Sequence, residues 1–106
     1  MPFKITITTT KPADSTALWP FEMNHEMLNQ DNTNLHEEWV SLQPGFIDRM
    51  STWITPGYVY EKIYIFDTKE NCDEFLRIRS TRHIQITKAE HFNANNFTTT
   101  TEVIEI

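Results

Sequence analysis

Aromatic and methionine side chains are abundant in this chain, and together they have the chemistry of a pocket for an apolar small molecule. Such pockets are lined by aromatic and flexible side chains, with a few polar groups that orient the ligand. We expect a cavity between the sheet and the first helical region, with His25 or Tyr60 as its polar contact. The residues expected to line it are Trp19, Phe21, Met23, His25, Trp39, Trp53, Tyr60 and Tyr64. The competing interpretation is that these side chains only fill the core and a dimer interface.

Histidines are the candidate proton carriers. An imidazole changes its charge near neutral pH, so His25 or His36 would move the proton if the pocket catalyses a reaction. A metal site would need two to four converging ligands. A polar run at 29–34 interrupts the helical pattern between His25 and His36, so their spacing does not predict a metal centre. His83 and His91 are interpreted as structural residues.

The other reactive groups favour structural roles. Cys72 is the one cysteine, which excludes an internal disulfide, and its spacing from Phe75 and Leu76 predicts a buried side chain. Two glycines are too few for a phosphate-binding loop. We therefore expect no bound cofactor.

Charge and hydropathy narrow the range of partners. The net charge of −6 argues against nucleic acid, which requires a basic face. A basic cluster at Arg77, Arg79, Arg82 and His83 is interpreted as cations at the C-terminal end of a helix, where they complement its dipole. No apolar run approaches the roughly 20 residues of a membrane span, and nothing at the start of the chain indicates export. We expect a cytoplasmic protein without a membrane partner.

The strands that must position these residues are marked by alternation and by turns. Apolar and polar residues alternate along 3–10, which predicts a strand. Pro44-Gly45 and Pro56-Gly57 have the residues that a type II turn requires, and they bracket a predicted strand at 46–55. Residues 58–66 are its antiparallel partner, and 97–106 form the last strand.

In the segments between the predicted strands, apolar residues recur at helical spacing. Leu18, His25 and Leu28 recur at helical spacing in a helix expected to start near Thr16, and a second piece is expected at 35–43. Asp67 or Thr68 caps the next helix, a break at 80–81 follows, and a short extra helix resumes near 84–92. The chain, 1–106, is therefore predicted to be one α+β domain of order βαββαβ.

In this order the elements resemble the dimeric α+β-barrel superfamily, the ferredoxin-like group that includes the antibiotic-biosynthesis monooxygenases. The features that carry the resemblance are Trp39 before Pro44-Gly45-Phe46, the aromatic strand ending in Phe66-Asp67-Thr68-Lys69-Glu70, and the split last helix before Phe97. It implies a four-stranded antiparallel sheet, two copies of which pair in a dimeric α+β barrel. It also implies the activity of cofactor-independent oxygenases, which act on easily oxidised substrates. Heme degradation is not implied, because its strand asparagine is missing from 3–10 and only Trp53 matches the pattern.

The strands give an independent reason to expect a homodimer. Phe46, Met50 and Ile54 are expected on one face of strand 46–55, with Ile47 and Trp53 on the other. Both faces of this sheet are thus partly apolar, and two helices can cover only one of them.

The sequence therefore predicts a homodimer that binds an apolar small molecule, either fatty-acid-like or aromatic. The alternative is a cofactor-independent monooxygenase or isomerase for a small aromatic or polyketide-like substrate.

Overall fold

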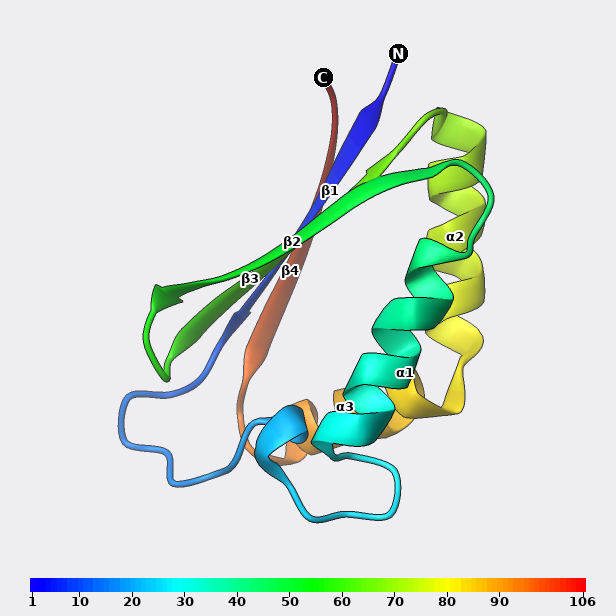
Figure 1. Cartoon of the computed structure of the whole chain (residues 1–106). Coiled ribbons are helices and arrows are strands. Elements are labelled where there is room, and N and C mark those ends of the chain that lie inside the picture. Colours follow the sequence, from blue (N-terminus) through cyan, green and yellow to red (C-terminus); the bar gives the residue numbers. More distant parts are fainter.

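A four-stranded antiparallel sheet, covered on one face by helices, forms the body of the molecule (Figure 1). The computed structural model describes residues 1–106. The strands are β1 (Phe3–Thr10), β2 (Phe46–Thr55), β3 (Val59–Phe66) and β4 (Thr98–Glu105), in the spatial order β2-β3-β1-β4. The helices are α1 (Gln30–Ser41), α2 (Lys69–Thr81) and α3 (His83–Ala94), with a short 3₁₀ turn, η1 (Pro20–Glu22). This is the ferredoxin-like α+β fold that the sequence predicts.

Both predicted Pro-Gly turns are present. Gly45 and Gly57 each have φ of 81°, the left-handed conformation that glycine adopts at little cost. The Phe46 amide donates to the Gln43 carbonyl at 3.1 Å, and the Tyr58 amide donates to the Thr55 carbonyl at 3.0 Å. These i to i+3 bonds close the turns, so the positions of the two glycines set both ends of β2.

Strand register decides which side chains face the helices. Ile5 pairs with Tyr64 and Ile7 with Lys62, so alternate residues of β1 and β3 point to the covered face. The expected faces of β2 need correction, because a bulge between Phe46 and Asp48 shifts the alternation. Phe46 therefore shares the covered face with Trp53, whereas Met50 lies on the open face.

The helix expected to start near Thr16 does not form. Residues 11–29 are mostly irregular, and α1 begins in the polar run that was expected to interrupt a helix. Asn29 caps it by accepting from the Asn32 amide at 2.8 Å, and the Asn32 side chain donates to the carbonyls of Glu26 and Met27. Asparagine side chains that bond to nearby backbone groups compete with the helix, which explains the difference.

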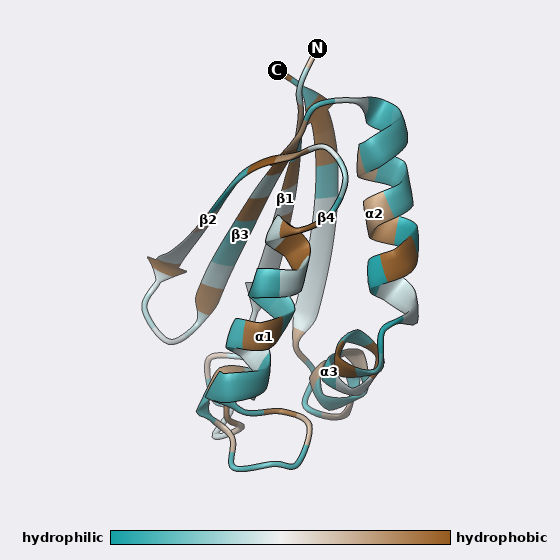
Figure 2. Ribbon diagram, turned by 45° about the vertical axis from the view of Figure 1, so that its right-hand side comes forward, coloured by the Kyte–Doolittle hydropathy of each residue, from teal (hydrophilic) through white to brown (hydrophobic).

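The core lies between the sheet and the helices α1 and α2, both of which are amphipathic (Figure 2). Ile5, Val40 and Phe66 are fully buried, as is Cys72, which confirms its predicted burial. Phe75 stacks on Phe66 with ring centroids 4.6 Å apart. Burying a side chain such as Phe66 stabilises the fold by about 1.5–3 kcal/mol. This core holds the helices against the sheet on one side of the site described below.

Candidate functional site

A cavity of about 300 Å³ lies between the covered face of the sheet, the segment before α1, and all three helices. This volume is at the lower end of the range for small-molecule sites. The apolar and small residues around it are Ile7, Thr9, Trp19, Pro20, Phe21, Leu28, Ile84, Ala89, Phe92 and Phe97, with Thr99 and Thr101. The more polar residues are Thr33, His36, Tyr60, Lys62, Arg79, Gln85, Lys88 and Asn93.

Aromatic rings form one part of this lining. The indole of Trp19 is only 3% exposed, and its ring centroid lies 5.1 Å from that of Phe97 and 6.4 Å from that of Phe92. Its Nε1–H donates to the Gly57 carbonyl at 2.9 Å. The carbonyl of Leu18 accepts from Nε2 of His91 at 2.7 Å. These two bonds attach the segment before α1 to the β2–β3 turn and to α3, so the aromatic wall is held in place.

Basic side chains form a second part of the lining. On β3, Lys62 follows Tyr60 by two residues and therefore points to the same face, about 7 Å further along the strand. On α3, Lys88 precedes Phe92 by four residues, about one helical turn. Arg79 reaches the same region from the end of α2. β3 and α3 each place an aromatic residue and a basic residue along the cavity. One end of the cavity is therefore aromatic and the other is polar.

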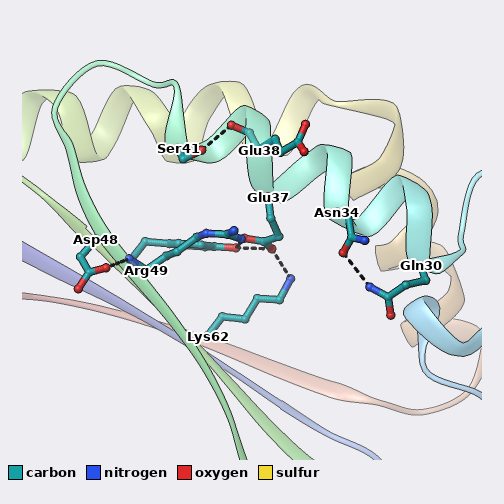
Figure 3. Close-up of polar contacts among 9 residues, drawn as sticks. Gln30, Asn34, Glu37, Glu38, Ser41, Asp48, Arg49 and Lys62 are labelled. Atoms are coloured by element: carbon teal, nitrogen blue, oxygen red, sulfur yellow. Dashed lines mark hydrogen bonds and ion pairs between the residues drawn. The ribbon is translucent and has the colours of Figure 1, made fainter.

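Glu37 holds Lys62 in position from the side of α1 (Figure 3). Its carboxylate accepts from Lys62 Nζ at 2.9 Å, from the Tyr64 hydroxyl at 2.9 Å and from Arg49 at 3.1 Å. Burial alone would raise the pKa of Glu37, but the charge and hydrogen bonds of these neighbours outweigh it and lower that pKa to about 2. Glu37 is therefore ionised, and its oxygens are already occupied by three donors.

Other polar atoms in the lining have no partner. Both ring nitrogens of His36, the Nε of Arg79 and the Oε1 of Gln85 are buried without a hydrogen bond. Burial, with the nearby charges of Lys88 and Arg79, lowers the pKa of His36 to about 3, so the imidazole is neutral at neutral pH. Burial, with the charges of Lys62 and Arg79, lowers the pKa of Lys88 well below its ordinary value. Unpaired polar groups in a cavity are unusual in a folded protein and point to a ligand site.

The structure brings part of the predicted pocket together. Trp19, Phe21, Tyr60 and His36 line the cavity. Trp53 packs against Tyr60 with ring centroids 4.8 Å apart, but it is not part of the lining.

Four other predicted residues lie outside the lining. Met23 and His25 belong to the segment before α1, where the Nδ1 of His25 accepts from the amides of Met27 and Leu28. Trp39 and Tyr64 pack around Phe75 in the core.

The basic residues of the lining are not among the residues predicted for the pocket. Arg79 and Lys88 both stand at helical spacing with apolar residues, and a cation on such a face is the signal that could have identified them. Lys62 likewise alternates with Tyr60 and Tyr64. The spacing of Arg79 from Cys72 and Phe75 predicts the buried side of its helix, and Arg79 is 9% exposed, but the helix-dipole interpretation of the basic cluster gives it no part in the pocket.

Two kinds of feature are not found. No three His, Cys, Asp or Glu side chains come close enough to hold a metal ion. None of the three helices combines the length and apolar character needed to cross a bilayer.

Comparison of the sequence with protein families and with curated proteins finds no match. Solved structures do match over nearly the whole chain. SnoaB, a cofactor-independent oxygenase from Streptomyces nogalater, is 12% identical with a TM-score of 0.63, over 99% of this chain and 92% of that one. A proposed monooxygenase from Shewanella loihica PV-4 is 12% identical with a TM-score of 0.59, over 99% and 93%. A proposed antibiotic biosynthesis monooxygenase from Deinococcus radiodurans is 7% identical with a TM-score of 0.59, over 98% and 91%.

At these identities the likeness concerns the fold. The match nevertheless extends over every strand and helix, in the order that the sequence pattern predicts. This chain therefore has the same ferredoxin-like fold as these solved oxygenase structures.

Proposed function

We propose that this protein binds a small molecule with an apolar body, aromatic or fatty-acid-like, in the cavity between its sheet and helices. The observation that carries the proposal is the cavity itself, about 300 Å³ in volume and walled on one part by Trp19, Phe21 and Phe92. Rigid rings around an open volume provide contact area for an apolar ligand at little entropic cost. The unpartnered atoms of His36 and Gln85 supply the polar groups that would orient it.

The test is binding of the neutral hydrophobic dye Nile red, followed by its fluorescence. Thr101 lies on the edge strand β4, is exposed and still lines the cavity, so Thr101→Trp fills the cavity with little disturbance of the core. Leu42→Trp adds the same ring at a position that is 81% exposed and outside the lining, and it serves as the control. We expect wild type and the control to bind the dye and Thr101→Trp to bind at least about tenfold more weakly. Absence of dye binding to the wild type, or equal binding by Thr101→Trp, would contradict the proposal.

A cofactor-independent oxygenase or isomerase is the second candidate, and one observation favours it. Both ring nitrogens of His36 are unpaired and Lys88 lines the same cavity, so two nitrogen groups that can exchange a proton with a bound substrate lie there. Loss of a proton from an electron-rich aromatic or polyketide-like substrate leaves an anion that can reduce dioxygen or be reprotonated at another carbon. His25 is less suited, because its Nδ1 already accepts two backbone amides.

The enzymatic candidate is tested by oxygen consumption and by product analysis with small phenolic and polyketide-like compounds. We expect His36→Gln and Lys88→Met to lower turnover by about 10²–10⁴, the range for loss of a general base. His25→Gln is the matched control, because His25 lies outside the cavity lining. Turnover that depends on His25 and not on His36 or Lys88 would place the chemistry elsewhere.

We further propose that two copies pair through the open face of the sheet. Met50 is 50% exposed and pairs with Ile63, and Ile104 is 39% exposed on the same face. An obligate interface of this kind buries about 2,000 Å² or more in total. We expect sedimentation to show twice the chain mass of 12.6 kDa, and Ile63→Asp to give the monomer. A stable, folded monomer of the wild type at micromolar concentration would exclude this dimer.

A cytoplasmic location is also proposed. Its support is Cys72, a single free thiol that the fold buries completely. Disulfides are common in oxidising compartments and rare in the cytoplasm, so a lone buried thiol fits a reducing environment. The acidic net charge of −6 supports the accompanying proposal that nucleic acid is not a partner. Fractionation of cells that express a tagged protein tests the location.

A further inference from the structure

The cavity has an excess of positive charge. Three basic side chains line it, those of Lys62, Arg79 and Lys88, and no aspartate or glutamate is part of the lining. This is unexpected in a chain whose net charge is −6. Glu37 lies just behind the lining, but its carboxylate is shared by Lys62, Tyr64 and Arg49. Glu37 is thus a single carboxylate close to several basic side chains, and it cannot neutralise all of them.

Arg79 is the clearest case of a positive charge without an anionic partner. It is 9% exposed, its Nε is buried without a partner, and its guanidinium is in none of the four salt bridges of the structure. A buried charge is costly unless it is paired and hydrogen-bonded. Arg79 also lines the cavity, so the space that is open to its partner is the cavity itself. The group that fits is an anion.

The shape of the site limits which anion fits. A free inorganic anion would leave the aromatic part of the cavity, at Trp19 and Phe92, without contacts. The steps from Tyr60 to Lys62 and from Phe92 to Lys88 put the backbone positions of the aromatic and the basic residues about 6–7 Å apart. A molecule with an apolar body and one acidic group at its end matches both parts.

We propose that the ligand of this cavity is an apolar carboxylate whose charged group binds Arg79 and Lys88 and whose body contacts the rings of Trp19 and Phe92. This inference rests on the proposed binding function and specifies its ligand class. A guanidinium donates two parallel hydrogen bonds to a carboxylate, which suits Arg79 as the main contact. Lys88 adds a second charge-assisted donor.

Binding of such a ligand is coupled to proton uptake. Lys88 faces Lys62 on β3, Arg79 on α2, and both His36 and Glu37 on α1. Burial, followed by the charges of Lys62 and Arg79, lowers the pKa of Lys88, and a carboxylate placed beside it acts in the opposite direction. Carboxylate binding is therefore expected to be weaker at higher pH, with protons taken up from the buffer.

The experiment is calorimetric titration with 2-naphthoate and with 2-naphthamide, a neutral molecule of nearly the same shape. We expect 2-naphthoate to bind at least about tenfold more tightly, the effect of one charge-assisted hydrogen bond. Arg79→Met is expected to remove this preference. Arg77→Met, two residues away on the same helix, is the control, because Arg77 is exposed and pairs only with Glu74.

Lys88→Met is an independent variant that replaces the amine by an apolar side chain of similar length. It is expected to weaken 2-naphthoate binding and to reduce proton uptake. Circular dichroism establishes that each variant is folded. Equal binding of 2-naphthoate and 2-naphthamide to the wild type overturns the carboxylate and leaves the apolar pocket standing. Failure of both to bind overturns the pocket as well. A preference that survives in both Arg79→Met and Lys88→Met overturns the assignment of the two residues.

Discussion

Replacing His36 by leucine is expected to remove a large part of the acid sensitivity of this protein. His36 is 2% exposed, and neither ring nitrogen has a hydrogen-bond partner. Its pKa is lowered from 6.5 to about 3, first by burial and then by the charges of Lys88, Arg79 and Lys62. Between these two values the unfolded chain binds a proton at His36 and the folded protein does not. Stability therefore falls as the pH drops through this window.

The magnitude follows from the two pKa values. One pH unit below the unfolded pKa corresponds to about 1.4 kcal/mol, so at about pH 5 the wild type has lost about 2 kcal/mol relative to neutral pH through His36 alone. Glu37 contributes little in this range. Its pKa is lowered from 4.5 to about 2, so its stabilising effect is lost only below about pH 4.5.

The assay is urea unfolding at about pH 7 and about pH 5, at one protein concentration because dimerisation would add to the stability. His36→Leu should lose about 2 kcal/mol less than wild type between these pH values. His83→Leu is the control, since His83 is an exposed imidazole at the start of α3, and it should keep the wild-type dependence on pH. Equal losses in wild type and His36→Leu would refute the assignment of a neutral, buried imidazole.

Four further outcomes are expected. Glu37→Gln should lower the free energy of unfolding by about 3 kcal/mol, because the buried cation of Lys62 loses its carboxylate, and a urea midpoint close to wild type would contradict this. Gly57→Ala should cost about 1–2 kcal/mol for its positive φ alone, since an added methyl meets nothing within 4 Å. Ala at Gly45 should cost at least about 1 kcal/mol more, because the methyl also collides with the Asp67 carboxylate, and equal melting temperatures for the two variants would be inconsistent with that collision. Cys72, fully buried and with its pKa raised by burial, should react with a thiol reagent about 100-fold more slowly in the native protein than in urea, as followed by absorbance.

The strands and their order along the chain could be derived without coordinates. Alternation predicted β1, and the paired Pro44-Gly45 and Pro56-Gly57 predicted both ends of β2, because each encodes a local backbone conformation. Thr68 as the cap of α2 and the break before α3 are equally local signals. Each of these features is set by a few neighbouring residues, so it can be recognised in a single sequence.

The segment before α1 and the bulge in β2 were not predictable in this way. Leu18 and His25 have helical spacing, but the bonds of Asn29 and Asn32 to the backbone favour another path. The bulge at Ile47 moves Phe46 to the helix side, and periodicity alone does not reveal an extra residue.

The charge of the cavity depends on residues that are far apart in the sequence. Lys62, Arg79 and Lys88 come from a strand and two helices, and each is ordinary in its local context. They meet because the β3 register turns Lys62 toward the helices, while the packing of α2 and α3 buries Arg79 and half-buries Lys88 at the same cavity. Their shared burial raises the cost of their charges, and that cost arises only once the chain is folded.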